Sequence, residues 1–186
     1  LLKNHVGLDT ALDYLSKMNL DRSDEKYLSI AMGGFTKGMT PLQMAGAYMV
    51  FANKGVYTKP VLYTEVKDNN GKVILSNKPV RTQVFSEQTV FIMDSLLEDV
   101  VKSGTARGFG VTLKKDGKTV TIPTAGKTGT SDSNKDKWFC GFTPYYVGAT
   151  WYGYDKNIQL GSGEYSMALK IWNAVMTKAH QGLDAK

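Results

Sequence analysis

The sequence has 186 residues, of which 42% are apolar, 22% charged and 11% aromatic, and these values exclude a mini-protein, collagen and chain-wide disorder. Lys and Arg total 23 against 17 Asp and Glu, a net charge of +6. Only three of the basic residues are Arg and the lysines are scattered, which argues against nucleic-acid binding, whereas an anionic membrane surface or polyanionic wall fits the charge.

Two helices are predicted in the first third of the chain. Residues 9–18 show a short amphipathic pattern with Asp9 as the N-cap. Thr40 as N-cap and Pro41 at the first helical position begin a second helix, which Gly55 ends. Residues 30–40 are rich in glycine and are expected to form a turn or loop.

The middle of the chain predicts a hairpin and a long helix. Residues 61–66 and 72–75 flank Asn69-Asn70-Gly71, and Asn and Gly tolerate positive φ, so the two segments are expected to pair. Residues 86–102 predict a helix capped by Ser86 and ended by Gly104. Six apolar residues are expected on its inward face: Val90, Met93, Leu96, Leu97, Val100 and Val101.

The last third predicts a sheet and a closing helix. Two short extended segments, 111–113 and 119–122, surround a turn, and longer strands are expected at 125–130, 138–143 and 146–152. A helix is predicted at 165–178. Helices followed by clustered strands and a final helix favour an α+β fold with an antiparallel sheet flanked by helices.

Cysteine and histidine are too few for a metal centre. The single Cys140 excludes an internal disulfide, and His5 and His180 lie far apart in sequence, so we expect neither a metal nor a cofactor. Cys140 lies in a strand pattern and is interpreted as a small packed hydrophobe. An amphipathic pattern is already present at the first residues, so we interpret the sequence as a fragment that begins inside or just after a helix.

The segment that most strongly indicates a chemical function is Lys127-Thr128-Gly129-Thr130. A phosphate-binding loop requires Gly six positions before the Lys, where this sequence has Thr121, and a helix afterwards, where it has a polar loop. In an extended strand, the hydroxyls of Thr128 and Thr130 lie on one face and can bind a carboxylate, while Lys127 points to the other side. Gly129 lets a ligand backbone approach the strand edge. A plain surface turn remains the alternative.

This segment and its surroundings resemble a known family. Lys-Thr-Gly is one of three signatures of serine penicillin-recognising enzymes. Further similar segments are 31–34, 38–45, 52–55, 97–106, 136–147 and 151–155. Together they resemble the transpeptidase domain of bifunctional, class A penicillin-binding proteins, from about residue 6 to residue 176. The resemblance implies a penicillin-binding-protein transpeptidase or serine β-lactamase-like fold, with residues 1–186 as the C-terminal part of one such domain.

The resemblance also implies a reaction and a set of roles. In this family a serine attacks the penultimate D-Ala of a peptidoglycan stem peptide, and β-lactams mimic D-Ala-D-Ala. Lys127 would add positive potential and hold a serine of the middle motif, Thr128 and Thr130 would bind the terminal carboxylate, and the backbone N–H of Thr130 would be an oxyanion donor. Thr105 and Trp138 are possible residues at the border of the cleft. The expected location is the extracytoplasmic face of the membrane, through an N-terminal anchor of the parent protein.

The serine nucleophile is missing from the pattern. The only Ser-x-x-Lys is Ser23 to Lys26, in a polar connector where two acidic residues crowd the serine, and one such match is expected by chance. We therefore expect the nucleophile upstream of this chain and the isolated chain to be inactive. A non-catalytic wall-binding or scaffolding module is the main alternative. A serine β-lactamase is disfavoured because those enzymes share Lys-Thr-Gly but not the Trp-Phe-x-Gly-Phe-Thr-Pro stretch at 138–144.

Overall fold

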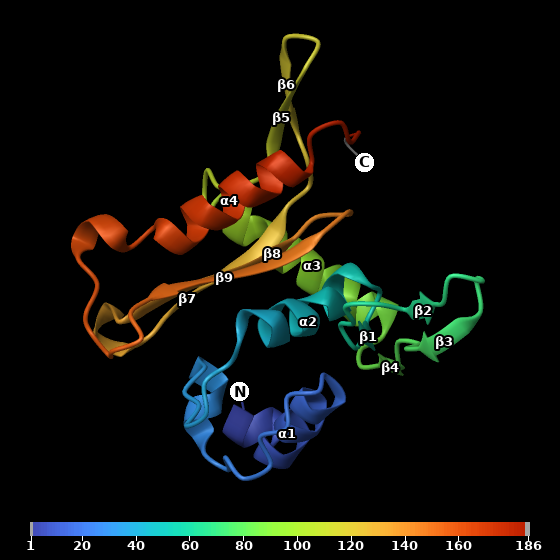
Figure 1. Cartoon of the computed structure of the whole chain (residues 1–186). Helices are drawn as coiled ribbons and strands as arrows, with labels where there is room; N and C mark the ends of the chain where they lie inside the picture. Colours follow the sequence, from blue (N-terminus) through green and yellow to red (C-terminus); the bar gives the residue numbers. More distant parts are fainter. Residues whose placement is uncertain (1, 185–186) are drawn as a thin grey trace. The chain divides into compact units, whose positions relative to one another are not determined.

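The computed structural model describes residues 2–184 and divides into two compact units (Figure 1). The first unit ends at Ser86 and the second begins at Glu87. No helix among residues 2–184 combines the length and apolar character that crossing a bilayer requires.

Helices and helical turns make up most of the first unit. They are a π-helical turn η1 (Leu2–Val6), α1 (Leu8–Lys17), a 3-10 turn η2 (Leu28–Met32) and α2 (Pro41–Ala52). The prediction that Asp9 caps α1 is wrong, because the chain enters the helix at Gly7 with φ +85°, and Asp9 lies in the first turn. The turn or loop predicted at 30–40 begins with the end of η2, the 3-10 turn that continues to Met32.

The start of α2 follows its sequence signals. Thr40 Oγ1 accepts the N–H of Gln43 at 3.2 Å, and Gln43 Oε1 accepts the N–H of Thr40 at 2.9 Å. This capping box satisfies two backbone donors that the first turn cannot pair internally. Gly55 follows the helix at φ +85°, and a Cβ there would lie 2.0 Å from the carbonyl oxygen of Phe85. The prediction of Thr40 and Pro41 at the start of the helix is therefore confirmed, whereas the helix ends at Ala52 with Asn53 as its C-cap, before Gly55.

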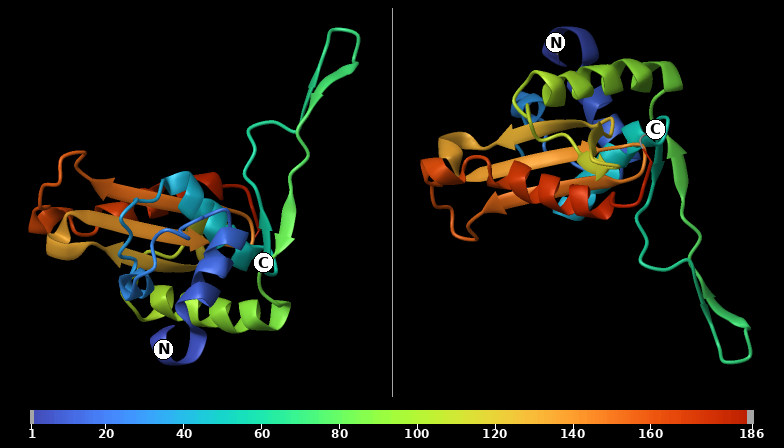
Figure 2. Two further views of the ribbon diagram at one scale, coloured as in Figure 1. Left: turned by 90° about the horizontal axis from the view of Figure 1, so that it is seen from below. Right: turned by 90° about the horizontal axis from the view of Figure 1, so that it is seen from above.

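Two small antiparallel pairs complete the first unit. The predicted hairpin forms between β2 (Glu65–Lys67), which is shorter than expected, and β3 (Val73–Ser76), which is shifted by one residue. A second pair joins β1 (Val56–Thr58) to β4 (Arg81–Gln83) and was not predicted, since three-residue strands carry no clear alternation. Figure 2 shows the β2–β3 hairpin projecting beyond the β1–β4 pair. Val50, Tyr57 and Val84 form the small core of this unit.

The second unit contains the predicted sheet. Its elements are α3 (Glu87–Lys102), β5 (Thr112–Lys115), β6 (Lys118–Thr121), β7 (Ala125–Thr130), β8 (Asp136–Phe142), β9 (Val147–Gly153) and α4 (Met167–Ala179), with 3-10 turns η3 (Asp132–Asn134) and η4 (Ser162–Glu164). β5 and β6 form a hairpin, and β7, β8 and β9 form an antiparallel sheet in that order. The α+β prediction is confirmed, and the bounds of β7 agree with those expected.

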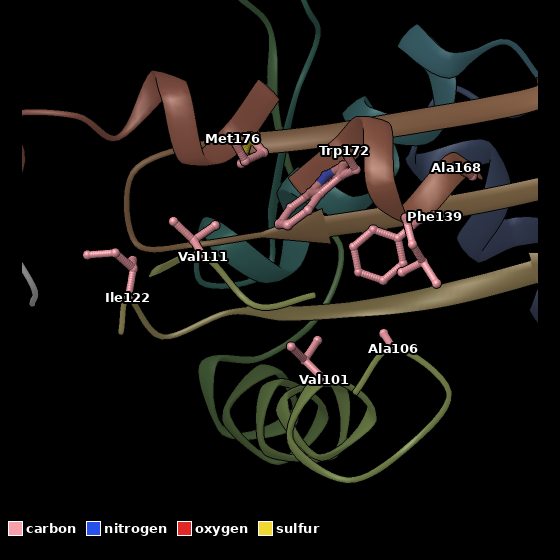
Figure 3. Packing of buried hydrophobic residues seen from close by; sticks show 9 residues of the cluster. Val101, Ala106, Val111, Ile122, Phe139, Ala168, Trp172 and Met176 are labelled. Atoms are coloured by element: carbon pink, nitrogen blue, oxygen red, sulfur yellow. The ribbon is translucent and has the colours of Figure 1, made fainter. Parts of the chain in front are cut away.

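The main core lies where helices cover the sheet. α4 packs on β8 and β9, and α3 packs against β7. The rings of Phe139 on β8 and Trp172 on α4 meet edge to face with centroids 4.9 Å apart, a favourable aromatic geometry. Figure 3 shows these two rings among the other buried residues of the cluster, which are Val101, Ala106, Val111, Ile122, Ala168, Leu169 and Met176.

The inward face of α3 is narrower than predicted. Val90, Leu97 and Val101 are buried, as expected. Met93 and Leu96 were also expected inside, yet their exposed fractions are 37% and 57%. Adjacent residues on a helix lie about 100° apart around its axis, so Leu96 and Leu97 share a face only if that face is broad. In residues 2–184, Leu96 remains at the surface.

Candidate active site

The Lys127–Thr130 segment forms the end of an edge strand. β7 pairs with β8 on one side, with Thr128 opposite Phe139 and Thr130 opposite Lys137. Paired residues of an antiparallel ladder share a face, so both hydroxyls project on the side where Phe139 packs on α4. The prediction that Thr128 and Thr130 share a face is confirmed.

The alternation of hydrogen-bonded and non-hydrogen-bonded pairs between β7 and β8 determines which backbone groups of β7 point away from β8. The N–H of Ser131 donates to the carbonyl oxygen of Asp136 at 3.2 Å, so these residues form a hydrogen-bonded pair. Because such pairs alternate along an antiparallel ladder, the N–H of Thr130 and the carbonyl of Thr128 are directed away from β8. Lys127 Nζ donates to that carbonyl at 3.0 Å, in agreement with this direction. The free edge therefore presents backbone groups at both threonines.

The threonine hydroxyls have polar neighbours on either side. The oxygens Thr128 Oγ1 and Thr105 Oγ1 lie 2.7 Å apart, and Lys127 Nζ lies 3.4 Å from Thr128 Oγ1. The side chain of Lys127, expected on the opposite side of the strand, thus folds back far enough to reach its neighbour. Thr130 Oγ1 accepts a hydrogen bond from Lys137 Nζ at 3.2 Å. Each of the two hydroxyls consequently lies beside a positive charge.

A pocket of about 180 Å³ adjoins these groups. Its walls combine hydroxyl, aromatic and aliphatic side chains with one lysine, and its lining residues are Thr105, Thr128, Gly129, Thr130, Lys137, Trp138, Tyr165, Ala168 and Leu169. The structure therefore brings together five of the six residues that the sequence singled out. Lys127 is not among the lining residues, although its ammonium reaches Thr128.

Gly129 is the residue at which a side chain would obstruct the strand. A Cβ there would lie 3.0 Å from the Cβ of Trp138, closer than real Cβ contacts normally come. Trp138 is half-buried beside it and lines the pocket. The absence of a side chain at Gly129 thus allows Trp138 to pack closely against the strand.

The turn after β7 is closed by a reciprocal contact. Ser131 Oγ donates to Asp136 Oδ2 at 2.7 Å and accepts the N–H of Asp136 at 2.8 Å. Asp136 Oδ1 also accepts the indole N–H of Trp151 at 2.9 Å. These bonds hold the ends of β7 and β8 together where the candidate residues lie.

Lys137 is the functional candidate that the sequence analysis missed. It is 8% exposed, and its Nζ donates to Asn134 Oδ1 at 2.8 Å as well as to Thr130. The predicted strand began at Trp138, so Lys137 was not placed on a strand. The available signal was alternation, because a strand extended to Asp136 places Lys137 on the same face as Phe139.

Two other nucleophile candidates do not have a reactive setting. Cys140 is buried, and burial raises the pKa of its thiol to about 12, which agrees with the prediction of a packed hydrophobe. Ser23 and Lys26 are exposed, and Lys26 Nζ binds Asp9 Oδ1 at 3.1 Å. The backbone N–H of Ser23 donates to Asp21 Oδ1 at 3.0 Å, which is typical of a connecting turn.

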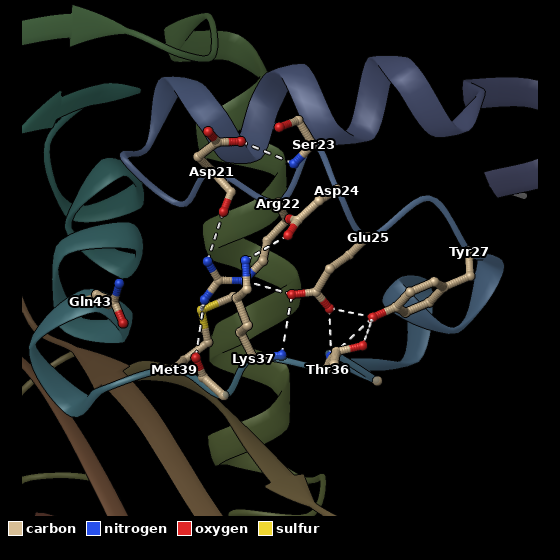
Figure 4. Close-up of polar contacts among 12 residues, drawn as sticks. Asp21, Arg22, Ser23, Asp24, Glu25, Tyr27, Thr36, Lys37, Met39 and Gln43 are labelled. Carbon is tan, nitrogen blue, oxygen red and sulfur yellow. Dashed lines mark hydrogen bonds and ion pairs between the residues drawn. The ribbon is translucent and has the colours of Figure 1, made fainter.

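The connector around Ser23 is instead organised by a buried ion pair (Figure 4). Arg22 Nε lies 3.4 Å from Glu25 Oε1, and both side chains are buried. Glu25 accepts the backbone N–H groups of Thr36 at 2.5 Å and Lys37 at 3.2 Å. Burial by itself would raise the pKa of Glu25, but hydrogen bonds from Tyr27, Thr36 and Lys37 lower it below its ordinary value. This network closes the segment from Arg22 to Lys37 into a loop.

Comparisons with known proteins agree with the fold and the motif. Residues 1–177 match the model of the penicillin binding protein transpeptidase domain. Penicillin-binding protein 1A of Clostridium novyi (strain NT) is 40% identical over 189 residues, which cover 100% of this chain and 21% of that protein. The chain therefore spans about a fifth of the length of that relative.

Solved structures give the same result. The crystal structure of penicillin-binding protein 1A from Haemophilus influenzae is similar with a TM-score of 0.78 and 25% identity, over 97% of this chain and 32% of that chain. The D,D-transpeptidase domain of a peptidoglycan glycosyltransferase from Eggerthella lenta has a TM-score of 0.54 and 28% identity, over 76% of this chain and 32% of that chain. The chain belongs to the penicillin-binding protein transpeptidase domain family, with class A penicillin-binding proteins among its relatives.

Proposed function

We propose that this chain supplies one side of the active site of a peptidoglycan D,D-transpeptidase that β-lactams acylate. The observation that carries the proposal is the free edge of β7. There the N–H of Thr130 points away from the sheet, and two threonine hydroxyls lie beside two lysines. A solved domain that the chain resembles is named as a D,D-transpeptidase domain, which supports the same reaction.

Each residue at this edge has a role in the proposal. The N–H of Thr130 donates to the oxygen that becomes negative when a carbonyl is attacked, and it is the oxyanion donor supplied by this chain. The hydroxyls of Thr128 and Thr130 bind the terminal carboxylate of the stem peptide. Lys127 adds positive potential and contacts a serine of the middle motif. Thr105 and Trp138 border the cleft, beside Thr128 and Gly129 respectively.

The nucleophile of the proposed reaction lies outside these 186 residues. Its hydroxyl oxygen attacks the carbonyl of the penultimate D-Ala, an ester forms, and the terminal D-Ala leaves as a protonated amine. An amine of a second stem peptide then attacks the ester, forms the cross-linking amide and releases the serine hydroxyl. No metal or cofactor takes part. With a β-lactam, the ring amide opens instead and the drug stays attached.

The proposed function also implies a location for the protein and a partner for its exposed apolar side chains. The substrate is a component of the cell wall, so the proposed location is the extracytoplasmic face of the membrane, with attachment through another part of the protein. The exposed apolar side chains of α3, among them Phe91, Ile92 and Leu96, support a further segment of the same domain that packs there.

Labelling with a fluorescent penicillin tests the proposal. We expect no covalent label on the isolated chain and stoichiometric label on the full-length protein, at a serine outside this chain. Label on the isolated chain would contradict the absence of a nucleophile. A full-length protein that folds but takes no label would indicate a scaffolding module, and rapid turnover of the drug would indicate a β-lactamase.

A further inference from the structure

Lys137 is an unusual lysine because it is almost completely buried without a carboxylate beside it. Its exposed fraction is 8%. Within residues 2–184, its ammonium makes no salt bridge to an Asp or Glu. Buried lysines are rare unless they are paired, since removing an ammonium from water costs several kcal/mol. A buried lysine kept beside neutral groups therefore calls for an explanation.

The neighbours of the ammonium are neutral: two hydrogen-bond acceptors and one aromatic ring. Nζ donates to Thr130 Oγ1 at 3.2 Å and to Asn134 Oδ1 at 2.8 Å, and it lies 4.5 Å from the centroid of the Tyr165 ring. The ring face is attractive to a cation but carries no compensating charge. The ammonium is thus held firmly, and its positive charge extends into the pocket that Thr130 and Tyr165 line.

The direction of the bond to Thr130 has a chemical consequence. An ammonium has donors and no acceptor, so Lys137 can only donate to the hydroxyl oxygen of Thr130. The hydroxyl proton of Thr130 must then point to some other acceptor. A carboxylate, which offers only acceptors, is the complementary ligand.

Thr128 differs from Thr130 in this respect. Its hydroxyl oxygen lies 2.7 Å from that of Thr105, and either group can donate to the other. Thr128 can therefore satisfy its proton within the protein, whereas residues 2–184 provide no acceptor for the hydroxyl proton of Thr130, which a ligand could accept. The two threonines of the Lys-Thr-Gly-Thr strand are therefore unequal, because Thr128 has the hydroxyl of Thr105 beside it.

We propose that Lys137 is a positioning residue that holds the Thr130 hydroxyl as a donor to the ligand carboxylate and makes the site selective for a free carboxylate. This proposal rests on the proposed acyl-transfer function. Lys137 acts through Thr130 and through its charge, without contact with the reacting atoms.

The test compares a penicillin that has its free carboxylate with the methyl ester of the same compound, in the full-length protein. The measured quantity is the ratio of the two second-order acylation rate constants. We expect Lys137→Met to lower this ratio about tenfold, because a charge-assisted hydrogen bond is lost, and to change the rate with the ester less than about twofold. Lys170→Met, an exposed lysine on α4, is the matched control and should leave the ratio unchanged.

Two further variants separate positioning from packing. In a Thr130→Val background, Lys137→Met should cause little additional loss of the ratio, because the two residues act as one unit. Lys137→Gln keeps a polar side chain near Asn134 and should show the same loss of selectivity if Lys137→Met does not fold. Equal loss of both rates would indicate a structural role and overturn the proposal, as would an unchanged ratio. Absence of acylation by either compound in the unsubstituted protein would instead overturn the proposed function.

Discussion

Two buried cations, one in each unit, are stabilised in opposite ways. Arg22 and Lys137 are both 8% exposed. Arg22 lies beside Glu25, whose carboxylate also accepts backbone N–H groups, so the two charges compensate each other inside the loop. Among the described residues, the partners of Lys137 are neutral. The comparison shows how a buried charge that is neutralised within a structural network differs from one that has no carboxylate beside it in residues 2–184.

The largest effect should follow from reversing the charge at the site itself. Lys127→Glu in the full-length protein places a negative charge where a carboxylate must bind, and we expect acylation by penicillin to fall about 100-fold or more. The measurement is the rate of covalent labelling. The matched control, Lys170→Glu, makes the same charge change at an exposed position on α4 and should label normally. Labelling of Lys127→Glu at a near-normal rate would remove Lys127 from the site.

The next largest effect, a loss of thermal stability, should follow from removing Glu25, the partner of the buried Arg22. Glu25→Ala leaves the Arg22 guanidinium buried and also strips acceptors from the N–H groups of Thr36 and Lys37. We expect the Tm to fall by about 5 °C or more. Scanning calorimetry or thermal denaturation checks this value. The double variant Arg22→Met with Glu25→Leu should recover part of the loss, and if it does not, the ion pair is not the cause.

The half-buried carboxyl group of Asp94 extends the comparison from cations to an acid. The side chain of Asp94 on α3 is half-buried, and its Oδ1 has no hydrogen-bond partner among the described residues. Burial, with a smaller contribution from the charge of Glu98, raises the pKa of Asp94 to about 6. A raised pKa means that the folded state binds the proton more tightly than the unfolded state, so stability falls as the pH rises from about 4 to 6.

Asp94→Asn tests this consequence. The variant should be more stable than the parent by about 1 kcal/mol above pH 6, a value that allows for solvent screening, and should show no gain at pH 4. Denaturant unfolding at a series of pH values measures the difference. Asp99→Asn, the same change at an exposed acid on the same helix, is the control and should not gain stability above pH 6. A gain of equal size at both pH values would indicate a cause other than titration.

The smallest effect is expected at Cys140. Its thiol is buried and its pKa is raised to about 12, so little thiolate is present near neutral pH. A thiol reagent such as dithionitrobenzoate should react at least about 100-fold more slowly with the folded chain than with the unfolded chain. Cys140→Ala should leave penicillin labelling unchanged. Fast modification of the folded protein would show that this strand opens readily.

The sequence predicted the parts of the fold that have strong local signals. The run from Ala125 to Thr130 marked β7, and the periodic apolar residues marked α3 and α4. The pairing of β1 with β4 depends on contacts between three-residue strands more than 20 residues apart, and no local pattern encodes it. The burial of Arg22 and Glu25 escaped prediction for a related reason, because charged residues in a connector are normally exposed.

The candidate site was predicted in part. Lys127, Thr128, Gly129 and Thr130 were identified from the motif, and the shared face of the two hydroxyls followed from strand geometry. Lys137 was not identified, because its contact with Thr130 depends on the cross-strand register of β7 and β8. Register is a property of the turn and of both strands together, so a motif on one strand does not reveal it.

The reciprocal contact between Ser131 and Asp136 has a consequence for the tolerated length of the turn. Side chains along a strand alternate between faces, so a slip of β7 by one residue against β8 would exchange the places of hydroxyls and non-hydroxyl residues. Lys127 and Gly129 would then occupy the face toward α4, and Thr128 and Thr130 would leave it. The same four residues would be present, but each side chain would lie on the opposite face of the sheet. The Ser131–Asp136 contact thus holds the register of β7 against β8, and we expect the insertion of a single residue at 132–135 to shift that register.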